Sequence, residues 1–160
     1  MDDASRIQDL GRALAKAIDQ AWLETRDRTF PEMVNAYRQV EADFVQRPGS
    51  NDFHILETKR RVAEAILRQA NSTDQSFQVC QDAWNELVRL GFTNLERRCR
   101  MTWFYADCCL LHGQYEMGLA LVEPLIAEFE TALADPTCTE QAKRFYNQEL
   151  EPLRKIRDEL

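Results

Sequence analysis

The predicted fold of this chain is decided by the stretch from Thr93 to Leu133, TNLERRCRMTWFYADCCLLHGQYEMGLALVEPLIAEFETAL. It predicts two helices that fold back on each other at Gly113, because glycine can end a helix in a left-handed conformation at no steric cost. Thr93 and Glu96 have the spacing of a capping box at the start of the first helix. After the turn, an apolar stripe at helical spacing follows: Tyr115, Gly118, Leu119, Val122, Leu125, Ile126, Phe129 and Leu133.

The first of these two helices is apolar almost all round between Met101 and Leu111. A helix of that kind is covered on more than one side. We therefore expect it to have helical neighbours both before and after it in a stack.

The remainder of the chain predicts five more helices. Apolar residues at steps of three and four place them at 5–24, 29–45, 54–70, from 72 to a stop at Gly91, and from 137 to the end. Three of them begin at expected capping boxes: Thr29 with Glu32, Ser72 with Gln75, and Thr137 with Glu140. No run of β-branched residues with a period of two is present, so no strand is predicted.

Two prolines fall inside predicted helices, Pro124 and Pro152. Proline lacks a backbone donor and its ring meets the carbonyl one turn earlier. Each is therefore expected to kink its helix or divide it.

Composition and charge limit the classes of function. A chain of 160 residues with 44% hydrophobic and 29% charged residues can bury its own core, and one domain over 1–160 is expected. The net charge of −7 opposes binding to nucleic acid or to anionic lipid, and it would attract a basic protein partner. The first residues, MDDASRIQDL, do not resemble a signal peptide and no apolar run approaches membrane length, so a cytoplasmic location is expected.

Five cysteines are present, an odd number without a C-x-x-C motif: Cys80, Cys99, Cys108, Cys109 and Cys138. They fall at apolar-stripe positions of the predicted helices. They are therefore interpreted as reduced core residues.

An internal repeat of side-chain classes links the second, fourth and sixth predicted helices. Phe30-x-x-Met33-x-x-Ala36-Tyr37 is matched by Phe77-x-x-Cys80-x-x-Ala83-Trp84 and by Tyr115-x-x-Gly118-x-x-Leu121-Val122. Each is preceded by another helix, which gives three helical hairpins and a closing helix.

The central hairpin resembles a tetratricopeptide repeat, in which a helix ends at Gly-x-Tyr and small residues let two helices pack closely. Ala106 and Gly118 match the small positions of that family, Tyr115 its aromatic after the turn, and Trp103 falls next to the place of its tryptophan. The resemblance implies an all-α, right-handed stack of about three antiparallel hairpins with a C-terminal capping helix. A plain helical bundle is the alternative.

Only two histidines, His54 and His112, are available for catalysis or for metal binding. Cys108 and His112 lie one turn apart and could offer two ligands to zinc, but a tetrahedral site needs more. No nucleophile signature and no glycine-rich phosphate loop is found. The expectation is therefore a protein that is not an enzyme and takes no metal or cofactor.

Two basic clusters, Lys59-Arg60-Arg61 and Arg97-Arg98-Arg100, stand out in the acidic chain. In the family arrangement such helices line one concave wall, and arginine and aromatic side chains often anchor partners. This predicts a groove that accepts acids. A solvated face that only balances nearby acids is the alternative. The predicted partner-binding residues are Arg61, Arg68, Arg100, Trp103 and Asp107.

Three functions remain open at this point. The first is a non-catalytic interaction module that holds a partner protein or peptide in a helical-repeat groove. The second is an acidic immunity or inhibitor protein that caps a basic toxin or enzyme, or a secretion chaperone. The third, more remote, is an enzyme that uses Cys108, Cys109 or His112.

Overall fold

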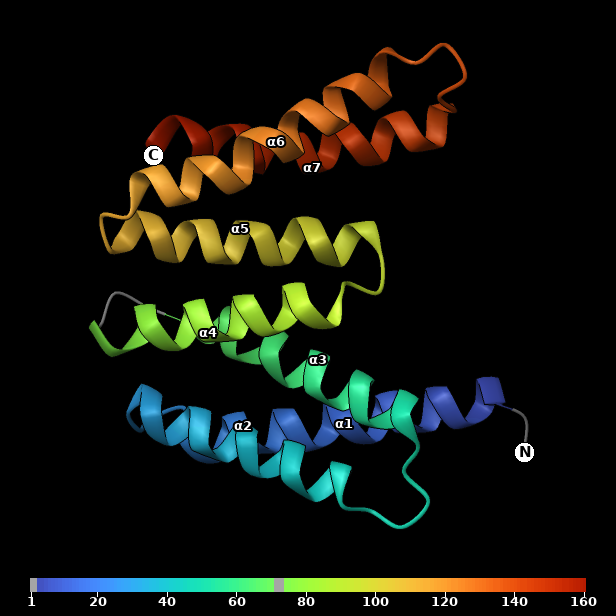
Figure 1. Ribbon diagram of the computed structural model, residues 1–160, viewed down its shortest axis with the longest axis vertical. Helices are drawn as coiled ribbons and strands as arrows, with labels where there is room; N and C mark the ends of the chain where they lie inside the picture. The colour runs from blue at the N-terminus through green and yellow to red at the C-terminus, as the bar shows by residue number, and fades with distance from the viewer. Residues whose placement is uncertain (1–2, 71–73) are drawn as a thin grey trace. The chain divides into compact units, whose positions relative to one another are not determined.

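The structure is a computed structural model, and it describes residues 3–70 and 74–160, apart from the side chains at 3, 74 and 75. Within these residues all regular structure is helical, and no strand occurs. The helices are α1 (Asp3–Thr25), α2 (Phe30–Val45), α3 (Asp52–Gln69), α4 (Asp74–Leu90), α5 (Leu95–Leu111), α6 (Tyr115–Ala134) and α7 (Glu140–Glu159) (Figure 1). The predicted all-α class is therefore confirmed.

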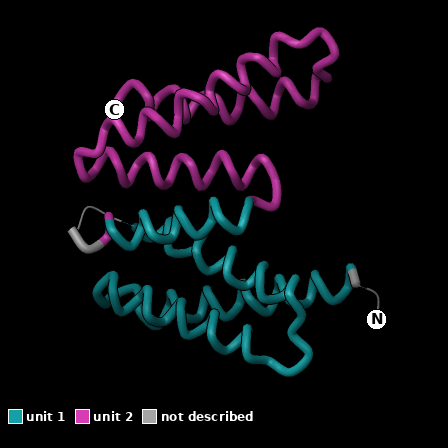
Figure 2. The backbone as a smooth tube through the Cα atoms, in the orientation of Figure 1, with its two compact units in different colours: residues 1–70, 78–91 teal, residues 71–77, 92–160 magenta. Residues whose placement is uncertain are grey.

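The chain forms two compact units, 1–70 with 78–91 and 71–77 with 92–160 (Figure 2). In the first unit, α1, α2 and α3 each pack against the other two. In the second unit, α5, α6 and α7 do the same. The stacking of hairpins along the whole chain, and its organisation as one domain, stay predictions.

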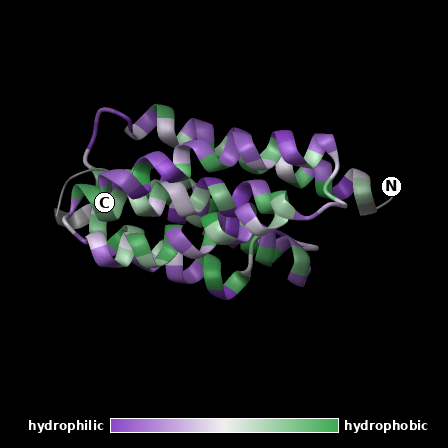
Figure 3. Cartoon of the chain, turned by 90° about the horizontal axis from the view of Figure 1, so that it is seen from above, coloured by the Kyte–Doolittle hydropathy of each residue, from purple (hydrophilic) through white to green (hydrophobic). Residues whose placement is uncertain are grey.

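The core of the second unit is built from all three of its helices. Polar and apolar residues alternate in patches along the helices, as Figure 3 shows, and the apolar ones turn inward. The buried cluster consists of Cys99, Ala106, Val122, Leu125, Ile126, Phe129, Leu150, Leu153 and Ile156. Burying each aliphatic side chain of this size contributes about 2 kcal/mol. The cluster therefore holds α5, α6 and α7 together.

The turn between α5 and α6 forms as the sequence predicts. Gly113 has a φ of +69°, in the left-handed region. Its N–H donates to the carbonyl of Leu110 (3.2 Å), and the N–H of Gln114 donates to the carbonyl of Cys109 (2.8 Å). This pair of bonds is a Schellman motif, which satisfies the last carbonyls of α5.

Close packing at Gly118 brings the three helices of the second unit together. A Cβ atom at Gly118 would lie 2.7 Å from Cδ2 of Leu160 and 3.3 Å from Cβ of Cys109. Ala106, the other predicted small residue, is fully buried. A larger residue at Gly118 would require the side chain of Leu160 to shift.

Of the predicted capping boxes, the one at Thr29 is confirmed. The Glu32 N–H donates to Oγ1 of Thr29 (3.4 Å), and the Thr29 N–H donates to the Glu32 carboxylate (3.0 Å). These bonds hold the pKa of Glu32 below its usual value. The pair Ser72 and Gln75 lies outside the residues whose side chains the structure describes.

The other two predicted boxes are wrong by one or two residues. Asn94, not Thr93, caps α5: its side-chain oxygen accepts the N–H of Arg97 (2.8 Å). Thr139, not Thr137, caps α7 by accepting the N–H of Ala142 (3.1 Å).

Thr137 has a different role in the loop before α7. Its N–H and hydroxyl both donate to Oδ1 of Asp135, at 2.8 and 2.7 Å. The next residue, Cys138, consequently lies in this loop, partly exposed, and not on a buried helical stripe.

The two helix-interior prolines do not divide their helices. α6 continues past Pro124 and α7 past Pro152, and both prolines are exposed. An exposed proline leaves the contacts of the buried residues beside it with the core intact. Each still removes one helical hydrogen bond from its own turn.

Candidate functional site

Two adjoining hollows lie along the seam between α5 and α7. The first, of about 270 Å³, is lined by Cys99, Arg100, Trp103, Phe104, Glu149, Pro152 and Leu153. The second, of about 280 Å³, is lined by Trp103, Asp107, Pro152, Lys155, Ile156 and Glu159. Because Trp103 and Pro152 belong to both, we treat the pair as one surface and call it the α5–α7 groove.

Helical spacing explains why these side chains share one surface. Arg100, Trp103 and Asp107 follow one another at three and four residues, which places them on one face of α5. In both helices the residue numbers rise from the first hollow to the second, so α5 and α7 run in the same direction along the groove. All lining residues come from these two helices, while α6 packs against both of them.

Trp103 lies at the centre of the groove. Its ring meets that of Phe104 edge-on, with the centroids 5.3 Å apart and the planes at 81°. The side chain is partly buried and packs against the core cluster of the second unit. Trp103 therefore offers a firmly held apolar surface to anything that enters either hollow.

Arg100 and Glu149 line the first hollow, and the carboxylate of Glu96 lies near both. Arg100 pairs with Glu96 one turn earlier (2.7 Å), and both side chains are about half exposed, at 50% and 54%. The pKa of Glu149 is raised by burial and by the nearby Glu96, although Arg100 opposes the shift. One guanidinium thus faces two carboxylates.

The second hollow has more carboxylates than cations among its lining residues. The pKa of Asp107 is raised, first by burial and then by the carboxylate of Glu159. Lys155 lines the hollow beside them. Burial and neighbouring carboxylates therefore disfavour the ionised forms of Asp107 and Glu149.

Burial raises the pKa of two thiols, and one of them, Cys99, lines the first hollow. Cys99 is buried, and burial together with Glu149 raises its pKa to about 12. Burial likewise raises the pKa of Cys109 to about 12. At neutral pH these groups stay protonated, and a protonated thiol does not attack.

The other residues considered for chemistry have structural surroundings. The ring of His112 lies against Phe77, with the centroids 5.4 Å apart. The backbone N–H of His112 donates to the carbonyl of Cys108 (3.1 Å) at the end of α5. Across residues 3–70 and 74–160, no group of three or more His, Cys, Asp or Glu side chains could hold a metal ion.

Of the predicted site residues, Arg100, Trp103 and Asp107 come together in the α5–α7 groove. The other two, Arg61 and Arg68, belong to the first unit. Arg68 lines a separate hollow of about 160 Å³ that residues of α1, α2 and α3 form, Asp19 and Trp22 among them. Arg61 pairs with Glu57 (2.9 Å), and its guanidinium lies beside Gly11.

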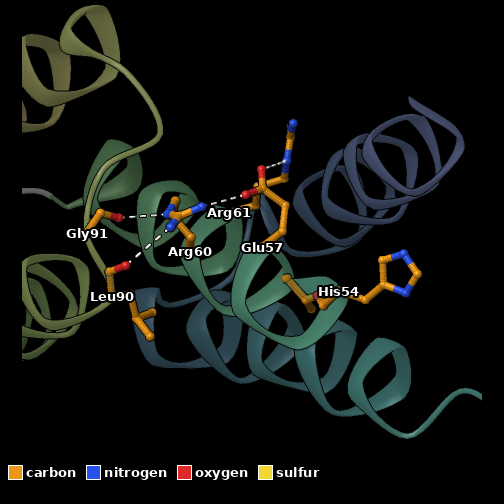
Figure 4. Close-up of polar contacts among 7 residues, drawn as sticks. His54, Glu57, Arg60, Arg61, Leu90 and Gly91 are labelled. Carbon is orange, nitrogen blue, oxygen red and sulfur yellow. Dashed lines mark hydrogen bonds and ion pairs between the residues drawn. The ribbon is translucent and has the colours of Figure 1, made fainter. Parts of the chain in front are cut away.

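The basic cluster at Lys59-Arg60-Arg61 is largely occupied within the protein. Arg60 is only 7% exposed. Its guanidinium donates to Glu57 (2.7 Å) and to the carbonyls of Gly91 (2.7 Å) and Leu90 (3.2 Å), as Figure 4 shows. Arg60 therefore satisfies the end of α4, where a helix presents partial negative charge.

The second basic cluster is also balanced by acids. Arg98 makes two hydrogen bonds to Glu128 on α6 (2.8 and 3.1 Å), and Arg100 pairs with Glu96. The sequence predicted a groove that accepts acids. The structure instead gives the α5–α7 groove more carboxylates than available cations.

Sequence reasoning missed the half of the groove that α7 supplies. Glu149, Pro152, Ile156 and Glu159 recur at three and four residues, a spacing that marks one helical face. That this face lies beside α5 depends on tertiary packing. The family resemblance implied this neighbour, because a repeat stack places the first helix of each hairpin beside the first helix of the next hairpin.

Comparison of the chain with protein-family models, curated proteins and solved structures finds no match. Among the described helices, none has the length and apolar character needed to cross a membrane. The function is therefore inferred from the chain's own residues.

Proposed function

We propose that this protein is a non-catalytic interaction module that holds a segment of a partner polypeptide in the α5–α7 groove. The observation that supports this proposal most directly is that Trp103 and Pro152 form the wall shared by two adjoining hollows. An aromatic anchor at the centre of a partly apolar surface with charged residues at its edges is typical of protein interfaces.

The arrangement of the hollows supports a peptide. The two hollows, of about 270 and 280 Å³, adjoin along one seam and share Trp103 and Pro152. Such a surface suits successive side chains of one polypeptide.

A tetratricopeptide-like stack is part of this proposal. It is supported by the tight turn at Gly113, the close contact at Gly118 and the buried Ala106. The packing of three helices recurs in each unit, where a hairpin is joined by the first helix of the next. Small-angle scattering would distinguish an elongated superhelix from a plain bundle.

Selection of short peptides from a displayed random library against the immobilised protein tests the function. Binding of the selected peptides, made synthetically, is then measured by calorimetry with the parent protein and with Trp103→Ala. The variant is expected to bind at least about tenfold more weakly, because a central aromatic residue carries much of the affinity of an interface.

Trp22→Ala is the matched control, since Trp22 is an exposed tryptophan on α1 in the other unit. It is expected to leave the affinity unchanged. Thermal unfolding of both variants separates lost binding from lost stability. Failure to select any peptide, or selected peptides that bind Trp103→Ala as well as the parent, would exclude the proposed groove.

The net charge of −7 favours a second candidate. In it, the acidic protein caps a basic surface of a toxin or enzyme as an immunity or inhibitor protein, or accompanies a secreted protein as a chaperone. Such capping depends on charge over a wide surface, so salt would abolish it. Capture of an apolar side chain beside Trp103 would persist in salt.

A further inference from the structure

We propose that the segment held in the α5–α7 groove carries a bulky apolar side chain and, close to it in the sequence, a lysine or arginine. The apolar side chain enters the first hollow, beside Trp103, Phe104 and Leu153, and the cation reaches Asp107 and Glu159 in the second. This inference rests on the proposed function, and it adds the chemistry of the partner.

The first step is the apolar character of the first hollow. Trp103 and Phe104 from α5 face Pro152 and Leu153 from α7, and the buried Cys99 closes the floor. The Cys99 thiol remains protonated, so it adds no charge there. An apolar side chain placed against these residues would leave water without losing a hydrogen bond.

The second step is the excess of carboxylates. Asp107, Glu149 and Glu159 line the two hollows, against Arg100 and Lys155. Arg100 is already engaged by Glu96, at 2.7 Å. A cation from a partner would relieve the repulsion between Asp107 and Glu159, whereas an acid would add to it.

The geometry also sets the spacing between the apolar side chain and the cation of the bound segment. Trp103 beside the apolar side chain and Asp107 beside the cation are four residues apart on α5, which corresponds to about 6 Å along the helix. An extended segment covers this distance in about two residues. A helical segment needs about four residues.

The test uses pools of synthetic peptides with random flanks and three fixed designs. Each pool has a leucine and, two residues before or after it, a lysine, glutamine or glutamate, and a parallel set has a four-residue spacing. A fourth pool keeps the lysine and replaces the leucine with serine. Binding of each pool to the intact protein is measured by fluorescence anisotropy.

The leucine–lysine pool is expected to bind at least about tenfold more tightly than the leucine–glutamate pool, with the glutamine pool between them. The double variant Asp107→Asn with Glu159→Gln should remove this preference. Glu123→Gln is the matched control, because Glu123 is an exposed acid on α6 outside both hollows. It should keep the preference.

Equal or tighter binding of the glutamine or glutamate pools would overturn the inference and leave the proposed function standing. If the serine–lysine pool bound as tightly as the leucine–lysine pool, the inference would also be overturned, because charge alone would then account for binding. If no leucine-containing pool binds, the proposed function falls together with the inference. A preference for lysine that survives the double variant would place the cation elsewhere and also refute the inference.

Discussion

Nε of Arg60 donates a hydrogen bond to the carbonyl oxygen of Gly91 over 2.7 Å, so a buried cation on α3 holds the end of α4. Gly91 has a φ of +81°, and its own N–H donates to the carbonyl of Leu87 (2.8 Å). The left-handed turn exposes a carbonyl that Arg60 then satisfies. Within the first unit, this contact ties α3 to the end of α4 through a charge.

Replacing Arg60 with methionine should lower the free energy of unfolding by about 3 kcal/mol, because it leaves buried Glu57 with one cation fewer and two carbonyls without a donor. Arg61→Met is the control. Arg61 also pairs with Glu57 but is more exposed, so its loss should cost about 1 kcal/mol or less. Urea unfolding of both variants measures the difference, and equal losses would contradict a special role for Arg60.

Asn94→Ala should destabilise the protein by about 1 kcal/mol, because the cap on the Arg97 N–H is lost. The neighbouring substitution Thr93→Ala should have a much smaller effect, since Thr93 does not cap α5. Thermal unfolding of the two variants decides between the caps. A larger loss for Thr93→Ala would restore the box that the sequence suggested.

Asp107→Asn should make the protein more stable at neutral pH. The folded state raises the pKa of Asp107, so it binds the proton more tightly than the unfolded chain does, and the ionised form is unfavourable in the fold. As the pH falls through the raised pKa, the parent protein becomes protonated at Asp107 and gains this stability.

The advantage of Asp107→Asn should consequently shrink as the pH is lowered from neutrality towards the usual pKa of an aspartate. Melting temperatures of parent, Asp107→Asn and the control Glu123→Gln over this range measure it. An advantage that does not change with pH would show that repulsion from Glu159 and burial are not its cause.

Gly118→Ala should bring no gain in stability, although alanine favours a helix by about 1 kcal/mol over glycine. The added Cβ would meet Cδ2 of Leu160 at 2.7 Å. In a Leu160→Ala background that obstacle is gone, and the same substitution should be more favourable by about 1 kcal/mol. A double-mutant cycle by urea unfolding measures this coupling, and additive effects would contradict the contact.

Local patterns in the sequence were sufficient for the helices, because an apolar stripe is a property of one segment. The residues that cap the helices were harder to predict from the sequence. Thr93 and Asn94, or Thr137 and Thr139, are competing caps within a few residues. Which of them caps depends on the backbone conformation of the loop before the helix.

The site was predictable in part. The face of α5 with Arg100, Trp103 and Asp107 follows from helical spacing alone. The charge of the groove does not, because Glu149 and Glu159 reach it from α7, and Glu96 engages Arg100 within α5. The role of Arg60 also depends on where the end of α4 comes to lie, which a pattern along the sequence cannot specify.

The five cysteines differ in access in a way that serves experiments on this protein. All lie in the described part of the chain, and Cys80, Cys99, Cys108 and Cys109 are buried, whereas Cys138 is partly exposed in the loop between α6 and α7. A maleimide dye added to the native protein would therefore attach at one position without mutagenesis. The same thiol offers a tether for immobilising the molecule in a single orientation, away from Trp103.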